Sequence, residues 1–153
     1  MATVLLVVGA PGAGKTTYAI GLAERRRAPR FSIDPWMQEL FAADMTKLDL
    51  EWIMARVARC ERQIWDVVCQ LLPLGVDVVL DLGFMTFDQR EQHRALARSN
   101  GAGVEVHYID VPVEVRRARV ARRNRERDPR VFAFEVTAPM FVLMDGRFEA
   151  PSP

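Results

Sequence analysis

Residues 9–16 read GAPGAGKT and match in full the pattern G-x-x-x-x-G-K-[ST]. Glycines in such a loop let successive backbone N–H groups turn toward phosphate oxygens, and the helix that follows directs its positive N-terminus at them. The lysine would reach the terminal phosphates, and the hydroxyl after it would ligate Mg²⁺. An ordinary glycine-rich turn is the alternative, but the motif follows an apolar run and opens a helical stretch. The sequence therefore predicts a site for a nucleoside triphosphate and Mg²⁺.

The predicted nucleotide-binding residues are this loop, the threonine after it and one arginine farther along the chain: Gly9, Ala10, Pro11, Gly12, Ala13, Gly14, Lys15, Thr16, Thr17 and Arg119. A TKLD segment at 46–49 resembles the guanine-reading element of GTPases. It precedes the long helix between the second and third predicted strands, whereas that element normally follows a late strand. We interpret it as a helix cap, so this segment makes no case for GTP. The residues alone predict a nucleoside triphosphate and Mg²⁺ as cofactors and leave ATP and GTP open.

Two aspartates at the ends of predicted strands supply further parts of a phosphoryl-transfer site. Asp81 follows the apolar residues 78–80, and α/β sheets hold their ligands at the carboxyl ends of strands, so Asp81 is predicted to bind Mg²⁺ with Thr16. Asp34 follows the short strand 30–33 and is predicted to accept the proton of an attacking hydroxyl. The alternatives are a turn or cap role for Asp81 and an N-cap role for Asp34, ahead of a helix that starts at Pro35.

Arginine accounts for all but two of the 21 basic residues, and eight arginines fall between Arg116 and Arg130. A genome rich in G and C gives the same excess, so position decides more than number. Arg119, Arg123 and Arg127 recur every four residues on one predicted helix face, which would close over a polyphosphate and neutralise transition-state charge. A solvated helix face is the ordinary alternative. RNA binding is a third, less favoured because no aromatic residue is interleaved with these arginines.

Length and composition limit the remaining classes. The 153 residues, 17.4 kDa, fit one domain, 1–153, and a chain that is 50% hydrophobic and 27% charged is not a disordered tail. A net charge of +1 makes no general case for nucleic acid or a membrane surface. Cys60 and Cys69 fit no metal or redox spacing, and no apolar stretch approaches the ~18 residues of a membrane span. We expect a cytoplasmic protein without a membrane or protein partner.

Short apolar runs alternate with helical stretches, which predicts an α/β fold of three layers with a mostly parallel central sheet. The expected strands are 3–8, 30–33, 76–80 and 104–109. The expected helices are 15–27, 35–43, one from 46 to 71, one from 86 to 100, one from 112 to 128 and one over 138–144. Thr46 with Asp49 and Thr86 with Gln89 resemble capping boxes, and Gly146 is expected to close the last helix. His93 and His107 are isolated and are interpreted as structural.

Four segments together resemble the small P-loop kinases of the AAA_33 or zeta-toxin-like group, which includes the kinase domain of phage polynucleotide kinase. They are VLLVVGAPGAGKTTY at 4–18, FSID at 31–34, VVLDLG at 78–83 and ARRNRER at 121–127, with DVP at 110–112 ahead of the arginine helix. The resemblance implies the P-loop kinase fold and ATP-dependent phosphorylation of a hydroxyl. It implies that Asp34 is the catalytic aspartate, that Arg123 and Arg127 contact ATP phosphates, and that residues 148–151 lie near adenine.

The sequence departs from that family at the acceptor side. Polynucleotide kinases of this type carry an arginine three residues after the catalytic aspartate, and here Met37 stands at that position, after Trp36. An apolar rim favours a less charged acceptor than a 3′-phosphorylated nucleic acid end. Arg90, after the Asp81 loop, would restore some charge. The predicted acceptor residues are therefore Asp34, Trp36, Met37 and Arg90.

The leading prediction is a single-domain P-loop kinase that moves the γ-phosphoryl group of Mg·ATP to a hydroxyl of a small molecule or nucleic acid. Its predicted catalytic residues are Lys15, Asp34, Arg123 and Arg127, and its metal ligands are Thr16 and Asp81. One alternative is an ATPase or nucleotide-dependent switch with no phosphorylated substrate. The other is a kinase or binder of RNA or DNA 5′ ends that uses the arginine-rich helix.

Overall fold

The computed structural model spans residues 1–153 and describes all of them except 84–85, 129–131, 133–134 and 153. Its strands are β1 (Thr3–Val8), β2 (Arg30–Ser32), β3 (Val78–Asp81) and β4 (Gly103–Tyr108). Its α-helices are α1 (Lys15–Arg26), α2 (Ile33–Phe41), α3 (Leu50–Leu71), α4 (Phe87–Ser99), α5 (Val113–Glu126) and α6 (Ala138–Arg147). Two single turns of 3₁₀-helix, Ala42–Asp44 and Leu72–Leu74, follow α2 and α3. The predicted order of elements is confirmed.

The described strands form one sheet in the order β2-β3-β1-β4, and every neighbouring pair is parallel. Leu5 lies opposite Val79 and Leu6 opposite Leu80 in the central pair of strands. The chain leaves β1 toward β2 but leaves β3 toward β4, so the connections diverge between these two neighbours. Such a switch point opens a crevice at the carboxyl ends of the strands, where α/β proteins hold their ligands.

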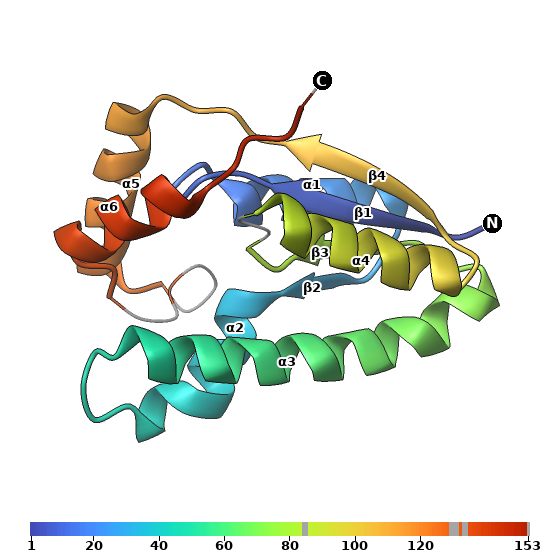
Figure 1. The fold of residues 1–153 in the computed structure, drawn as a ribbon, viewed down its shortest axis with the longest axis horizontal. Coiled ribbons are helices and arrows are strands. Elements are labelled where there is room, and N and C mark those ends of the chain that lie inside the picture. Colours follow the sequence, from blue (N-terminus) through green and yellow to red (C-terminus); the bar gives the residue numbers. More distant parts are fainter. Residues whose placement is uncertain (84–85, 129–131, 133–134, 153) are drawn as a thin grey trace.

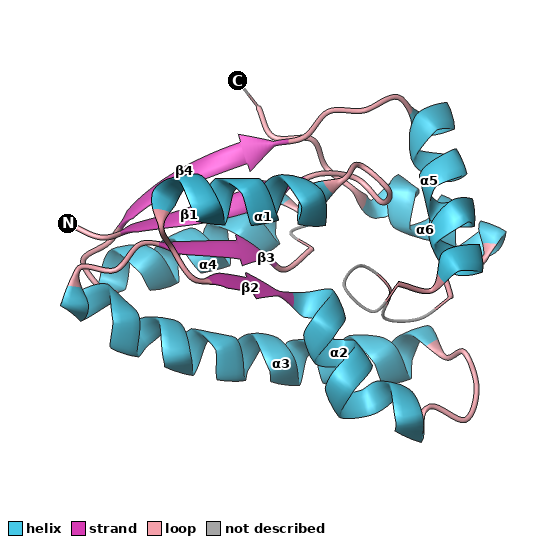
Figure 2. Ribbon diagram, turned by 180° about the vertical axis from the view of Figure 1, so that it is seen from behind, coloured by secondary structure: helices cyan, strands magenta, loops and turns pink. Residues whose placement is uncertain are grey.

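Helices cover both faces of the sheet and make the predicted three layers (Figures 1 and 2). Ile64 and Val68 of α3 pack on Leu6 and Leu80 of the sheet. Ala97 of α4 belongs to the same cluster. On the opposite face, Ala19 and Leu22 of α1 pack on Leu5, Val7 and Val79. This two-sided cover explains why β1 is an unbroken apolar run, since residues of both faces are buried.

The caps of the helices correct several predicted boundaries. Thr86 and Gln89 form the predicted reciprocal capping box of α4. Thr46 does not cap α3: the Asp49 carboxylate accepts hydrogen bonds from the N–H groups of Glu51 and Trp52, and the helix begins one residue later. Pro112 is the N-cap of α5 and not its first residue. Gly146 lies within α6, because that helix runs on to Arg147.

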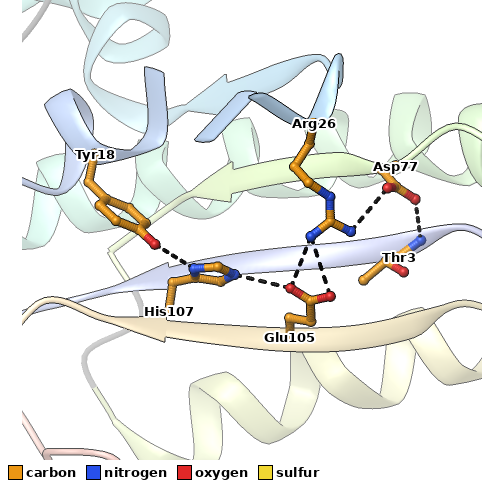
Figure 3. Close-up of polar contacts among 6 residues, drawn as sticks. All are labelled: Thr3, Tyr18, Arg26, Asp77, Glu105 and His107. Atoms are coloured by element: carbon orange, nitrogen blue, oxygen red, sulfur yellow. Dashed lines mark hydrogen bonds and ion pairs between the residues drawn. The ribbon is translucent and has the colours of Figure 1, made fainter. Parts of the chain in front are cut away.

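A chain of polar contacts fixes α1 against the sheet (Figure 3). At the end of α1, Arg26 binds Asp77 at 3.2 Å and Glu105 at 3.1 Å. The Asp77 carboxylate accepts the Thr3 backbone N–H at 2.8 Å. The Tyr18 hydroxyl lies 2.6 Å from Nδ1 of His107, whose Nε2 lies 3.2 Å from Glu105. These contacts join side chains of α1 to the sheet. They therefore hold the helix in a fixed orientation, with its N-terminus at the glycine-rich loop.

The second histidine is also engaged with the core. The Trp65 indole N–H donates to Nδ1 of His93 at 2.7 Å, which joins α3 to α4. Burial lowers the pKa of His93 to about 4, so it is neutral at pH 7. Within the described ranges, no three His, Cys, Asp or Glu side chains gather into a metal-binding group. No described helix is both long enough and apolar enough to cross a membrane.

Candidate functional site

The glycine-rich loop leaves β1 at the switch point of the sheet, beside the end of β3. Gly12 and Gly14 have φ values of 79° and 89°, in the left-handed region where glycine is favoured. A Cβ at Gly12 would also overlap the backbone carbonyl of Arg116, so the loop needs glycine for the close approach of α5. The Ala13 N–H donates to the Ala10 carbonyl at 3.1 Å. The loop is therefore a tight turn that leads into the N-terminus of α1, as an anion cradle requires.

Lys15 folds back over this loop. Its Nζ donates to the Gly9 carbonyl at 3.0 Å and lies 3.4 Å from the Ala10 carbonyl. Burial lowers the pKa of Lys15, while the nearby carboxylates of Asp81 and Asp34 act to raise it. A phosphate would complete the neutralisation of this ammonium group, which carries no carboxylate ion pair among the described residues.

Thr16 and Asp81 meet across the switch point. The Thr16 hydroxyl donates to Oδ2 of Asp81 at 2.8 Å, and the Ser32 hydroxyl donates to the same oxygen at 2.9 Å. Asp81 is 3% exposed. Hydroxyl and carboxylate oxygens are hard donors of the kind Mg²⁺ takes, and Mg²⁺ commonly uses one or two protein oxygens besides waters and phosphates. The residues fit the predicted metal, with Thr16 and Asp81 as the ligands that would hold it.

Asp34 lies near enough to Lys15, Asp81 and Arg123 for their charges to act on its carboxylate. The N-cap of α2 is Ser32, so the helix begins before Asp34 and the predicted start at Pro35 is wrong. The Asp34 side chain has no hydrogen bond or ion pair with any residue that the structure describes. Burial and then repulsion from Asp81 raise its pKa to about 6, against the lowering effect of Arg123 and Lys15. The N-cap alternative therefore does not account for Asp34.

The arginines of α5 divide into separate roles. Arg116 is buried: it donates to the carbonyls of Val111 at 2.9 Å and Pro11 at 3.3 Å and pairs with Asp145 at 2.7 Å. It ties the loop to α5 and α6, whereas its sequence position, one turn before Arg119, places it with the arginines expected to face the polyphosphate. Arg119 donates to the Ala13 carbonyl at 3.0 Å and so lies against the loop as predicted.

Two cavities open from this region. The first, of about 580 Å³, lies between the glycine-rich loop, α1 and α5. The second, of about 320 Å³, lies between α2, α3, the segment after β3 and α6. The residues common to both linings are Gly12, Lys15, Asp34 and Arg123. The structure thus brings the predicted lysine, aspartate and one lid arginine to the boundary of two adjoining spaces.

Not every predicted residue reaches these cavities. Met37 lines the second cavity, while Trp36 packs among the apolar side chains between α2 and α3. Arg90 is buried and donates to the Glu149 carbonyl at 2.6 Å. Its guanidinium therefore holds the C-terminal segment against α4. Arg127 ends α5 with a φ of 53° and places its guanidinium over the Phe132 ring. Neither Arg90 nor Arg127 occurs among the described residues that line the two cavities, and their roles toward acceptor and phosphate stay predictions.

The segment at 148–151 also lies outside both linings. Phe148 stacks on Tyr108 with ring centroids 6.1 Å apart, and Glu149 contacts α4. Conversely, sequence reasoning missed the wall that α3 and α6 give to the second cavity. Ile53, Val57 and Met144 belong to it. Their helical spacing was visible, but it looks the same whether a stripe packs against a sheet or borders a cavity.

Comparisons with known proteins agree with this arrangement. The AAA_33 family model, described as an AAA domain, matches residues 4–151. A candidate kinase from Chloroflexus aurantiacus superimposes with a TM-score of 0.77 at 19% identity, over 98% of this chain and 78% of that one. Kti12 from Chaetomium thermophilum, solved with ADP-AlF3, gives 0.71 at 22% identity, over 98% and 82%. The Mycobacterium tuberculosis APS kinase, solved with AMPPNP and APS, gives 0.67 at 16% identity, over 99% and 84%.

These structures share the fold at low identity, and none of the curated proteins matches the sequence. The family model is the stronger finding, because it spans nearly the whole chain, from the first buried strand past the last helix. With the glycine-rich loop at the switch point of a parallel sheet, the fold is that of the P-loop kinases. The chain belongs to the AAA_33 family of AAA domains.

Proposed function

We propose that this protein is a phosphotransferase that moves the γ-phosphoryl group of Mg·ATP to a hydroxyl of an acceptor. The observation that carries the proposal is the shared boundary of the two cavities. Lys15, Asp34 and Arg123 line both spaces, so a group bound in one cavity meets a group bound in the other at these side chains. A nucleotide hydrolase needs room for a water, whereas here a second cavity of about 320 Å³ adjoins the first.

The first cavity is suited to the nucleotide. Its lining contains the loop residues Ala13, Gly14 and Thr16, and Arg119 and Arg122 come from α5. The N-terminus of α1 and these cations would neutralise the phosphates. Mg²⁺ would be held by Thr16 and Asp81 and, when bound, supplies charge neutralisation between the phosphates. Solved relatives with the same fold hold ADP-AlF3 or AMPPNP, which supports the assignment.

Asp34 is proposed as the general base. The acceptor oxygen forms a bond to the γ-phosphorus, the bond from phosphorus to the bridging oxygen of ADP breaks, and the hydroxyl proton passes to the Asp34 carboxylate. A carboxylate with a pKa of about 6, and with no hydrogen bond or ion pair to any described residue, is ionised at pH 7 yet more basic than an ordinary aspartate. Lys15 and Arg123 are proposed to stabilise the charge that develops on the transferred group.

The direct test is acceptor-dependent ADP formation with Mg·ATP by wild type and Asp34→Asn. The panel holds 5′-hydroxyl oligonucleotides, nucleosides, sugars, UDP-sugars, aminocyclitols and simple alcohols. We expect at least one acceptor to raise ADP formation by the wild type, and Asp34→Asn to bind ATP but lose this response by about 10²-fold or more. Asp66→Asn, an exposed carboxylate of α3 outside both linings, is the matched control and should behave as wild type.

A second variant separates binding from chemistry. Lys15→Ala should lose nucleotide binding, measured by calorimetry with AMPPNP and Mg²⁺, because it removes a buried ammonium group that lies against the loop, bonded to the Gly9 carbonyl at 3.0 Å. Retained binding would remove Lys15 from the phosphate site. Slow ATP hydrolysis by wild type and Asp34→Asn alike, whatever acceptor is added, would contradict the phosphotransferase proposal and support a nucleotide-dependent switch.

A further inference from the structure

The second cavity is lined mostly by apolar side chains, and this bears on the class of acceptor. We propose that it takes a small alcohol whose body is predominantly apolar, seated on α2 and α3 with its hydroxyl at Asp34. The inference rests on the proposed function and names the acceptor class for the same site. A sugar, a nucleoside or a nucleic acid end is a competing acceptor that the experiment below separates from it.

The apolar lining comes from three sides of the cavity. The residues from α2 and α3 are Ile33, Met37, Leu50, Ile53, Met54 and Val57. Leu82, after β3, and Met144, on α6, face them across the space. Ile53 and Leu82 are also almost wholly buried, at 0% and 2% exposure, so their positions are held by the core. A ligand that fills this space therefore exchanges water for hydrocarbon over most of its surface.

Three polar side chains of the lining, Thr86, Gln89 and Asp81, are already hydrogen-bonded within the protein. Thr86 and Gln89 bond each other in the capping box of α4, and Asp81 accepts from Thr16 and Ser32. An acceptor with a hydroxyl on nearly every carbon would bury several of them here without partners. Each such group costs affinity, because its bonds to water are lost and not replaced.

The charged side chains of the lining do not make the second cavity a site for a polar acceptor. Lys15, Asp34 and Arg123 stand on the wall shared with the first cavity and are proposed to act on the transferred group. Arg147, at the end of α6, is exposed, so its charge is solvated at the mouth and attracts a ligand only weakly. The first cavity differs, since arginines of α5 and acidic residues line it.

The volume sets a second limit. At about 320 Å³ the cavity is at the lower end of the ~300–1,000 Å³ typical of small-molecule sites. A cavity of this size has room for a small ligand. Met37 of α2 lines the cavity and is 4% exposed, so a buried thioether forms part of its wall.

The experiment compares acceptors that have the same hydroxyl but different bodies. Straight-chain primary alcohols from propan-1-ol to octan-1-ol are tested against sorbitol, which matches hexan-1-ol in carbon number, and against nucleosides and 5′-hydroxyl oligonucleotides. Binding is measured by calorimetry on the protein with AMPPNP and Mg²⁺, and turnover by ADP formation. We expect Kd and KM to fall up to about fourfold per added methylene until the cavity is full. Sorbitol should neither bind nor react.

A pair of variants locates the binding. Met54 lines the cavity and is 45% exposed, so Met54→Asp should fold while placing a charge at the apolar wall. We expect it to weaken hexan-1-ol binding by roughly tenfold or more. Ala55→Asp puts the same charge on the adjacent, exposed position outside the lining and should change binding less than twofold. Met54→Leu should retain wild-type binding, and circular dichroism checks the fold of all three.

The outcomes separate this inference from the proposed function. Phosphorylation of sorbitol, a nucleoside or an oligonucleotide with a lower KM than every alkanol would overturn the apolar-acceptor inference and leave the phosphotransferase in place. Equal alcohol binding by wild type and Met54→Asp would also overturn it. Alcohol binding that Met54→Asp removes, without ADP formation on any acceptor, would uphold the apolar site and overturn the phosphotransferase.

Discussion

The Thr16 hydroxyl donates a hydrogen bond of 2.8 Å to Oδ2 of Asp81, although the two residues are 65 positions apart in the chain. The contact exists because β1 and β3 are neighbours in the sheet, so the loop that follows β1 meets the end of β3. The two residues that sequence reasoning proposed for Mg²⁺ are therefore within reach of one ion.

Asp81→Asn tests this pair. An amide oxygen in the place of Oδ2 can still accept from both Thr16 and Ser32, so the melting temperature should fall by only a few degrees. The loss of the negative charge should weaken Mg²⁺-dependent nucleotide binding by about tenfold or more. Calorimetry with AMPPNP, with and without Mg²⁺, measures this. Ser32→Ala, which removes one hydrogen bond but no charge, should keep the Mg²⁺ dependence, and equal Mg²⁺ dependence in Asp81→Asn would contradict the metal assignment.

The proposed base sets the pH dependence of the reaction. Burial and the neighbouring Asp81 raise the pKa of Asp34 to about 6, and only the ionised carboxylate accepts a proton. The value of kcat/KM for the acceptor should therefore rise tenfold per pH unit below about 6 and level off above 7. Steady-state rates between pH 5 and 8 measure this rise of kcat/KM with pH. If the low residual rate of Asp34→Asn keeps the same rise, another group titrates.

The same pKa predicts an unusual effect on stability. The pKa of Asp34 in the folded protein, about 6, lies above the ordinary aspartate value of 3.8, so the folded state binds the proton more tightly. Its contribution to stability is full below pH 4 and is lost as pH rises through 6. Asp34→Asn, which cannot ionise, should thus be more stable than wild type at pH 7.5 by on the order of 2 kcal/mol. Thermal unfolding should show this gap closing near pH 4; a lower melting temperature at pH 7.5 would mean a structural role.

The contacts of Arg116 should link the stability of the protein to nucleotide binding. Its buried guanidinium bonds two carbonyls, of Val111 and Pro11, and pairs with Asp145. Arg116→Met should cost about 3 kcal/mol of unfolding free energy, because these partners are left without it, and should weaken AMPPNP binding because Pro11 belongs to the loop. Arg117→Met, an exposed neighbour on the same helix, is the control. A denaturant midpoint equal to that of the wild type in Arg116→Met, as in Arg117→Met, would contradict this stabilising role of Arg116.

Local patterns predicted several short elements around the glycine-rich loop. The loop at 9–16, the strand that ends at Asp81 and the capping box at Thr86 are each encoded within a few residues, and each occurs in the structure where it was expected. Boundaries near capping residues were less predictable. Asp49 and Thr46 are both good caps, and only the packing of α3 decides which one the helix uses.

The sequence by itself determined the alternation of strands and helices and the glycine-rich turn after β1, because these depend on contacts between residues close together in the chain. The tertiary structure alone decided which arginines are buried and which line a cavity. It also decided that Arg90 bonds the Glu149 carbonyl. It also decided that apolar residues of α2, α3 and α6 border a cavity. An amphipathic stripe has the same periodicity whether it fills a core or lines a space, so only the arrangement of the helices distinguishes the two.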